Sequence, residues 1–163
     1  MNPRRARDIL VFSVAIVVLA ADQLSKSWVQ QNLLPGMPWN PVPWLRPILS
    51  FTLVTNKGAS FGLFPELSWL YTLVAMVVIA VILLFYRRFP TDHWLVMLSL
   101  GLQLGGAFGN LVDRLWRGQV VDFIDLNFWP LQEWPVFNVA DSSIVVGVCI
   151  LAAYLFFFAQ DLA

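Results

Sequence analysis

Residues 118–125 read Gly-Gln-Val-Val-Asp-Phe-Ile-Asp, and residues 137–141 read Phe-Asn-Val-Ala-Asp. Within them Asp122 and Asp141 each sit among apolar neighbours, in a chain whose composition suits lipid. A carboxylate next to hydrocarbon is costly, so such residues usually pair with another charge or take part in chemistry. We therefore expect the rest of the chain to bring these two side chains together at one surface of a membrane.

The overall composition indicates a multi-pass membrane protein. Of the 163 residues 59% are hydrophobic and 12% are charged, and the mean hydropathy is +0.72. The length suits a single domain covering residues 1–163. A formal net charge of zero argues against a nucleic-acid partner. One cysteine excludes an intrachain disulfide and one histidine excludes a histidine-rich zinc site, so we expect no metal and no cofactor.

Four apolar stretches are long enough to cross a bilayer as α-helices, which takes roughly 20 residues. They cover residues 9–28, 69–86, 94–112 and 141–158. Between the first two, residues 30–67 are rich in Pro, Trp and β-formers and predict strands at 48–54 and 59–64 around a turn at Asn56-Lys57-Gly58. Strands with unpaired edges do not lie in hydrocarbon, so we expect this insertion to form a small sheet at the membrane surface.

The basic residues predict the orientation, because lysine and arginine concentrate on the cytoplasmic side of a membrane. Five of the ten lie in two short stretches, at Arg4, Arg5, Arg7, Arg87 and Arg88. This distribution places both termini and the loop at Arg87 in the cytoplasm, and the sheet outside it. Seven of the eight tryptophans, all but Trp94, then fall on or beside the outer face.

Several polar residues fall near the outer ends of the predicted helices. Asp22 and Lys26 are four apart on one face of the first helix, and Asn110 and Arg114 are four apart on the third. The third helix also carries a glycine every four residues from 101 to 109, which favours close packing against other helices.

Two assignments remain open from the residues alone. Asp125 competes with Asp122, because spacing does not distinguish them. Asp141 opens the fourth helix, where an acid can cap backbone amides and favour the helix dipole. Asn138, three residues earlier, could equally serve as the cap and free Asp141 for chemistry.

Two neighbouring carboxylates suit the hydrolysis of an amide. Each raises the cost of ionising the other, so one holds a proton while its partner acts as a base. The base takes a proton from water and the acid donates one to the scissile carbonyl, without a covalent intermediate.

Two nucleophilic mechanisms compete with the acid pair. A Ser–Lys pair is the main enzymatic rival, since candidate serines and lysines lie on the outer side. These residues are Ser25, Ser27, Ser60, Lys26 and Lys57. A thiol–imidazole pair is disfavoured, because Cys149 lies well below Asp141 in the fourth helix and His93 lies at the opposite membrane face.

Five motifs in series resemble those of bacterial lipoprotein signal peptidase, also called signal peptidase II. They are Asp22-Gln-Leu-Ser-Lys26, Asn56-Lys-Gly-Ala-Ser-Phe61, Gly105-Gly-Ala-Phe-Gly-Asn-Leu-Val-Asp-Arg114, Gly118-Gln-Val-Val-Asp-Phe-Ile124 and Phe137-Asn-Val-Ala-Asp141. Their order, their spacing and the plan of four spans all agree with that family. The resemblance implies four transmembrane helices with a small extracytoplasmic β-sheet subdomain between helices 1 and 2.

The resemblance also implies a function and a site. The chain would be an aspartic endopeptidase of the bacterial inner membrane that cleaves prolipoproteins just before a cysteine carrying diacylglyceryl. It would act as a monomer in contact with lipid, near the periplasmic face. Asp122 and Asp141 match the catalytic pair, which decides against Asp125. The positions that match its substrate-binding residues are Asp22, Lys26, Asn56, Gly58, Asn110, Arg114 and Asn138.

Two other classes of function compete with a peptidase. In a small membrane transporter, Asp122, Asp141, Lys26 and Arg114 would relay protons or substrate. A carrier needs ionisable residues near the midplane with access from both sides, whereas here the middles of the four spans lack charge. An assembly scaffold would not require two acids beside apolar residues.

Overall fold

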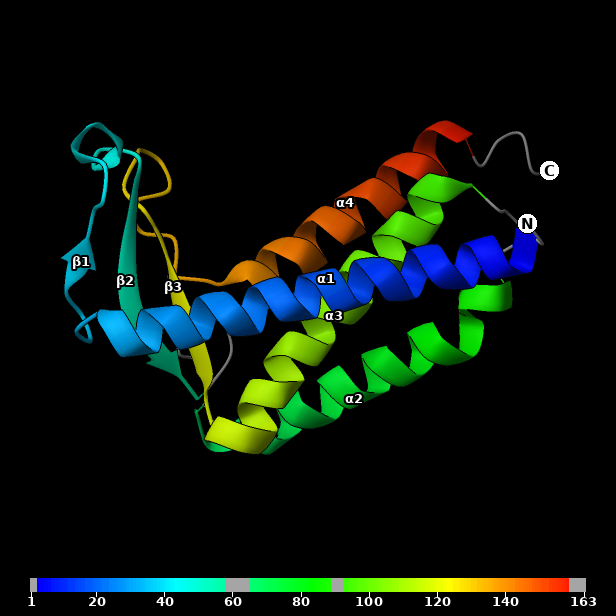
Figure 1. The fold of residues 1–163 in the computed structure, drawn as a ribbon, viewed down its shortest axis with the longest axis horizontal. Coiled ribbons are helices and arrows are strands. Elements are labelled where there is room, and N and C mark those ends of the chain that lie inside the picture. The colour runs from blue at the N-terminus through cyan, green and yellow to red at the C-terminus, as the bar shows by residue number, and fades with distance from the viewer. Residues whose placement is uncertain (1–2, 58–64, 89–92, 159–163) are drawn as a thin grey trace.

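The computed structural model of the protein describes residues 3–57, 65–88 and 93–158 (Figure 1). Within these ranges lie four long helices: α1 (Pro3–Asn32), α2 (Ser68–Phe85), α3 (Trp94–Arg117) and α4 (Val139–Phe158). All four are long and apolar enough to cross a membrane. The four predicted spans are therefore confirmed as helices. α3 continues to Arg117, beyond the predicted end at 112, and stops where Gly118 adopts a left-handed conformation with φ of 71°.

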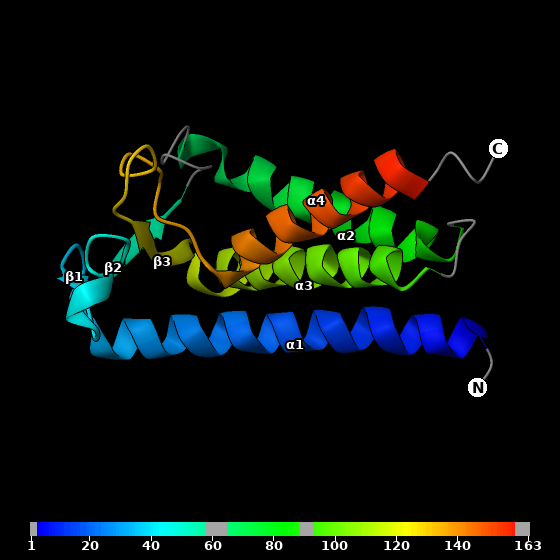
Figure 2. The same ribbon diagram turned by 90° about the horizontal axis from the view of Figure 1, so that it is seen from above.

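The third helix is the centre of the bundle. It packs against α1, α2 and α4, and it lies between α1 and the other two helices when the bundle is seen from above (Figure 2). Of the apolar stretch of α3, 67% is buried, against 22% for α1, 11% for α2 and 17% for α4. The outer three helices therefore turn most of their apolar surface outward, as lipid requires.

Glycines allow this central packing. A Cβ on Gly105 would lie 2.7 Å from the backbone oxygen of Ala15, on α1. A Cβ on Gly106 would lie 2.4 Å from the backbone oxygen of Ala140, on α4. Both distances are shorter than any real side chain tolerates, so the predicted packing role is confirmed for Gly105, and Gly106 packs against α4 in the same way.

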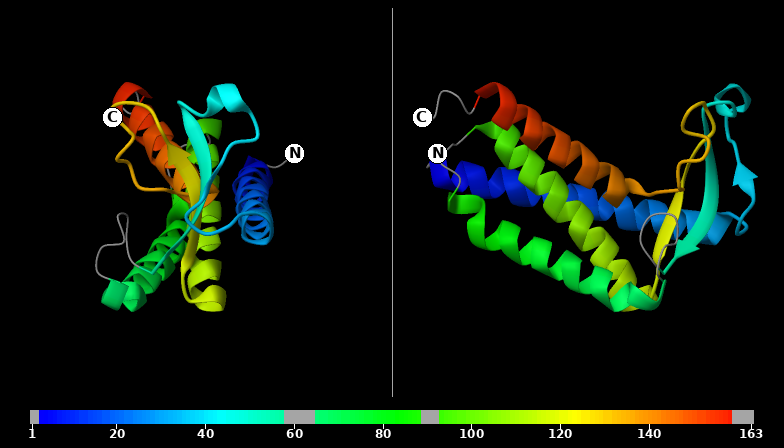
Figure 3. Two further views of the ribbon diagram at one scale, coloured as in Figure 1. Left: turned by 90° about the vertical axis from the view of Figure 1, so that its left-hand side faces the viewer. Right: turned by 180° about the vertical axis from the view of Figure 1, so that it is seen from behind.

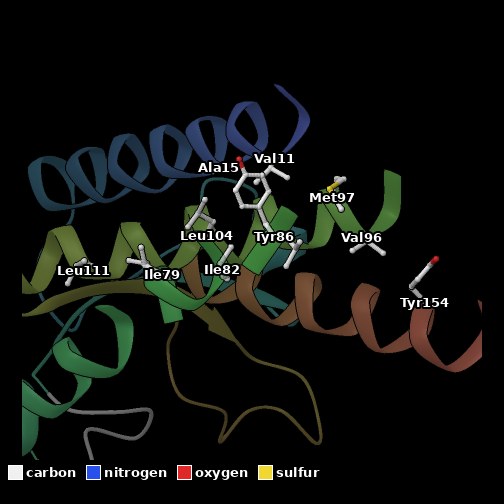
Figure 4. Packing of buried hydrophobic residues seen from close by; sticks show 12 residues of the cluster. Val11, Ala15, Ile79, Ile82, Tyr86, Val96, Met97, Leu104, Leu111 and Tyr154 are labelled. Carbon is white, nitrogen blue, oxygen red and sulfur yellow. The ribbon is translucent and has the colours of Figure 1, made fainter. Parts of the chain in front are cut away.

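The apolar core lies mostly in the half of the bundle farther from the sheet. α1 contributes Val11 and Ala15, α2 contributes Ile79 and Ile82, and α3 adds Leu104 and its apolar neighbours (Figure 4). In the described chain, buried charged side chains occur only near the sheet end of the bundle, at Asp22, Lys26, Asp113 and Asp122.

A three-stranded antiparallel sheet stands across one end of the bundle (Figures 1 and 3). Its order is β1 (Pro38–Trp39), β2 (Leu49–Asn56) and β3 (Val120–Leu126). The sheet packs on the end of α1, where Val29 and the next residue after the helix, Leu33, form one apolar cluster with Leu53, Val121 and Phe123.

The predicted hairpin is only partly right. The strand expected at 48–54 is β2, but it pairs with β1 and β3. The strand expected at 59–64 lies outside the described residues. β3 was not expected as a strand, because residues 120–126 pair with a segment more than sixty residues away and local pattern does not report such a contact.

Candidate active site

The pairing of β3 brings Asp122 close to the start of α4. The backbone of Phe137 exchanges hydrogen bonds with Ile124, and its oxygen also accepts one from the amide of Phe123. This short connection places Asn138 beside Asp122, whose Oδ1 accepts a hydrogen bond of 2.7 Å from Asn138 Nδ2.

The first turn of α4 then orients Asp141. Asn138 Oδ1 accepts a hydrogen bond of 2.9 Å from the backbone amide of Asp141. In return, Asp141 Oδ2 accepts one of 3.3 Å from the backbone amide of Asn138. This reciprocal arrangement is a capping box with Asn and Asp in place of the usual pair. Asn138 and Asp141, which the sequence offered as alternative caps, therefore cap the helix together.

All four oxygens of the two carboxylates accept hydrogen bonds. Asp122 Oδ2 accepts one of 3.4 Å from Asn56 Nδ2, and Asp141 Oδ1 accepts one of 2.7 Å from Asn110 Nδ2. Asn138 donates to both acids, through its side chain to Asp122 and through its backbone to Asp141. The two carboxyl groups are thus fixed around one residue.

The environment of Asp122 makes it a weaker acid than usual. Its side chain is almost fully buried, and burial together with the nearby Asp141 carboxylate raises the pKa of Asp122 from 3.8 to about 6. Hydrogen bonds from Asn138 and Asn56 oppose that rise, because they stabilise the ionised form. A carboxyl group of this kind can exchange a proton near neutral pH, which is the property that general acid–base chemistry needs.

A cavity of about 720 Å³ opens beside the two acids. Five polar residues line it near the acids: Asn56, Asn110, Arg114, Asp122 and Asp141. The rest is mostly apolar and comes from α2, α3, α4, β3 and residues 131–137. The cavity therefore combines a carboxylate pair with walls that suit hydrocarbon.

A buried ion cluster supports the two acids from behind. Lys26 Nζ lies 2.8 Å from Asp22 Oδ2 and 2.8 Å from Asp113 Oδ2, and all three side chains are fully buried. Asp22 Oδ1 accepts a hydrogen bond of 3.0 Å from the amide of Ala140, and Asp113 Oδ2 accepts one of 3.2 Å from the amide of Val121. Each of these amides belongs to the residue just before one of the two acids. The cluster consequently holds β3 and α4 together at the site.

Of the predicted site residues, Asn56, Asn110 and Arg114 line the cavity with the two acids. Asp22, Lys26 and Asn138 are fully buried behind it and do not line it. Gly58 lies outside the described residues.

Two further members of this arrangement were not expected from the sequence. Gln23 Nε2 donates to Asp22 and Asp113, and Arg117 pairs with Asp113 and donates to Gln23 Oε1. The i, i+4 spacing of Asp113 and Arg117 could have indicated their ion pair from the sequence.

Ser60, one of the rival nucleophiles, lies outside the described residues, and Ser25, Asp125, Cys149 and His93 are placed unfavourably. Ser25 Oγ donates to the backbone oxygen of Asp22, while its neighbour Lys26 is held in the ion cluster. Asp125 does not line the cavity and accepts a hydrogen bond of 2.7 Å from Thr52 on the sheet. Cys149 is exposed on α4. His93 caps the start of α3, at the far end of that helix from the two acids.

Comparison with known proteins gives one consistent family. The family model for signal peptidase II matches residues 14–157. A lipoprotein signal peptidase from Moorella thermoacetica is 46% identical over 138 residues, which cover 85% of this chain and 87% of that protein. One from Geobacillus thermodenitrificans is 38% identical, covering 94% of this chain and 93% of that protein.

Solved structures agree with this result. A bacterial membrane enzyme at 2.3 Å resolution superposes with a TM-score of 0.82 at 25% identity, covering 93% of this chain and 90% of that one. A second bacterial membrane enzyme, at 1.9 Å, gives a TM-score of 0.79 at 26% identity over 91% and 93% of the two chains.

Proposed function

The chain belongs to the signal peptidase II family and removes signal peptides from prolipoproteins, and we propose that it does so as an aspartic endopeptidase with Asp122 and Asp141 as its catalytic pair. The observation that carries this proposal is the cavity, where both acids lie at the polar end of apolar walls. A signal peptide is largely apolar and its scissile bond is polar, so one cavity can receive both parts.

The proposed reaction needs one ionised and one protonated carboxyl group. The ionised acid takes a proton from a water molecule as the water oxygen bonds to the scissile carbonyl carbon. The protonated acid gives its proton to the carbonyl oxygen, so that a neutral tetrahedral intermediate forms. As the intermediate collapses, the C–N bond breaks and the nitrogen leaves with the proton held by one acid. One hydroxyl of the intermediate gives its proton to the other, ionised acid as the carboxyl group of the product forms. The pair then holds one proton again, and no covalent intermediate is required.

The proposed substrate is a prolipoprotein whose cysteine already carries diacylglyceryl, and cleavage occurs just before that cysteine. Apolar residues of α2 and α4 supply facing walls of the cavity, including Val74, Val78 and Val145. Their composition supports a lateral approach of acyl chains and signal peptide from the bilayer. We propose that the enzyme works as a monomer in contact with membrane lipid.

The supporting residues divide into two groups in this proposal. Asn56, Asn110 and Arg114, with Gly58, bind the substrate. Asp22, Lys26 and Asn138, which the resemblance implied as substrate-binding residues, instead position the acids, because they are fully buried and are held by hydrogen bonds within the protein.

The proposed orientation follows from charge. Arg87 and Arg88 lie at the end of the bundle opposite the sheet, where α1 begins and α4 ends (Figure 1). Basic residues favour the cytoplasmic side, so the termini would lie in the cytoplasm and the site near the periplasmic face of the inner membrane. A transporter is not favoured, because the buried charges gather at one end of the bundle.

The direct test is cleavage of a diacylglyceryl-modified prolipoprotein by the purified protein in detergent or bilayers. The signal peptide should be released intact, and the product should begin with the modified cysteine. Cleavage elsewhere, or equal cleavage of a precursor that lacks diacylglyceryl, would contradict the proposed substrate.

A further inference from the structure

One polar side chain of the cavity wall takes no part in the site described above. Gln103, on α3, lines the cavity, yet its Nε2 atom is buried and has no hydrogen-bond partner within residues 3–57, 65–88 and 93–158. A buried amide donor without a partner is destabilising, because it loses its hydrogen bonds to water and gains none in return.

The surroundings of Gln103 leave room for its side chain. Gly147, on α4, faces it, and a Cβ there would lie only 2.8 Å from Gln103 Cγ. The terminal torsion of a glutamine is soft, so a rotation can turn Nε2 from the wall toward the cavity.

The depth of Gln103 matches a particular part of the proposed substrate. It precedes Asn110 by seven residues, which places it about 10 Å deeper along α3 than the amide that contacts Asp141. An extended peptide advances about 3.3 Å per residue. A signal peptide whose scissile bond lies at the acids therefore passes Gln103 roughly three residues before that bond.

From this juxtaposition we infer that Gln103 binds the substrate, by donating a hydrogen bond from Nε2 to a carbonyl oxygen about 10 Å deeper than the scissile bond. This inference rests on the function proposed above and adds a binding residue to it. Two carbonyls of the substrate could reach that depth: a backbone carbonyl of the signal peptide, where its helix ends and its last carbonyls lack partners, or an ester carbonyl of the diacylglyceryl group.

The first measurement is the stability of a Gln103→Met variant, which keeps the length of the side chain and removes the amide. The variant should melt in detergent at the same temperature as the wild type or higher, because it removes an unpaired buried donor. If the Gln103 amide instead stabilised the fold, its removal would lower the melting temperature. A clear fall in melting temperature therefore overturns the inference.

The second measurement is the kinetics of cleavage. Gln103→Met should raise KM by about threefold to tenfold, the size of one neutral hydrogen bond, with kcat little changed. Gln31→Met is the matched control, because Gln31 is exposed and donates to Ser27, away from the cavity. Equal KM values for Gln103→Met and Gln31→Met contradict the inference.

Altered substrates then identify the carbonyl. One substrate carries ether-linked alkyl chains in place of the esters, and others carry an alkene in place of one peptide bond at the second, third or fourth residue before the cleavage site. The KM difference between wild type and Gln103→Met should vanish for the substrate that lacks the acceptor. Persistence of the full difference with every substrate overturns the inference. Failure of the wild type to cleave any of them would contradict the proposed function as well, so the two failures are distinguishable.

Discussion

Asn138 and Asp141 hold each other at the first turn of α4: the backbone amide of Asp141 donates to Asn138 Oδ1, and the backbone amide of Asn138 donates to Asp141 Oδ2. The second oxygen of Asp141 remains directed to Asn110 and lines the cavity with it. A helix cap thereby fixes the direction of a carboxyl group that we propose to be catalytic. The same Asn138 donates to Asp122, so the spacing of the acids depends on one side chain.

The first prediction concerns the ion cluster behind the site. Lys26→Met should lower the free energy of unfolding by about 3–5 kcal/mol, because it leaves Asp22 and Asp113 buried without their shared cation. Thermal and denaturant unfolding in detergent measure this effect.

The control for Lys26 is an ion pair at the other end of the bundle. Arg87 Nη2 lies 2.7 Å from Asp8 Oδ2, and the Arg87 side chain is 67% exposed. Arg87→Ala should therefore change stability little, since exposed pairs are screened by solvent. Equal destabilisation by the two substitutions would mean that the buried cluster does not hold β3 and α4 together.

The second prediction concerns Arg114, which lines the cavity and donates to the backbone oxygen of Asn110. Arg114→Ala should reduce kcat/KM by about 10- to 100-fold and leave measurable cleavage, because Arg114 is one of several groups that position the substrate. Arg88→Ala, at the far end of the bundle, should cleave normally. A loss as large as that of the catalytic acids would show that Arg114 does more than position the substrate.

Sequence reasoning located the helices and most of the polar cluster. The four spans follow from apolar runs, and the i, i+4 spacing predicted that Asp22 and Lys26 share a face, where they form an ion pair of 2.8 Å. The third member, Asp113, comes from another helix, and no local pattern reports such a contact.

The choice among the acids shows a second limit of the sequence. Spacing alone could not separate Asp122 from Asp125, and only the family motif did so. The structure gives the physical difference, because register opposite β2 turns Asp122 to the cavity and leaves Asp125 with Thr52. β3 itself was missed, since its partner strand is distant in sequence.

The third prediction is a pH dependence. Burial and the Asp141 carboxylate raise the pKa of Asp122 to about 6, so Asp122 holds a proton below about pH 6 and loses it as the pH rises above that value. Once Asp122 is ionised beside the Asp141 carboxylate, the pair has no proton to donate, so kcat/KM should fall about tenfold for each further pH unit above about 6. Asp125→Asn should keep this profile. A rate that stays constant from about pH 6 to about pH 8.5 would contradict the assignment of Asp122.

Single-turnover cleavage of a diacylglyceryl-modified precursor by asparagine variants decides whether Asp122 and Asp141 form the catalytic pair. Asparagine has nearly the shape of aspartate but cannot act as a carboxylate base. Asp122→Asn and Asp141→Asn should each fold and bind the precursor, yet cleave it at least ~10³-fold more slowly. The double variant should be little worse than either single one, because the acids act as a unit, and Asp125→Asn should cleave well. Near-normal cleavage by Asp141→Asn would leave that residue as a helix cap alone and contradict the account.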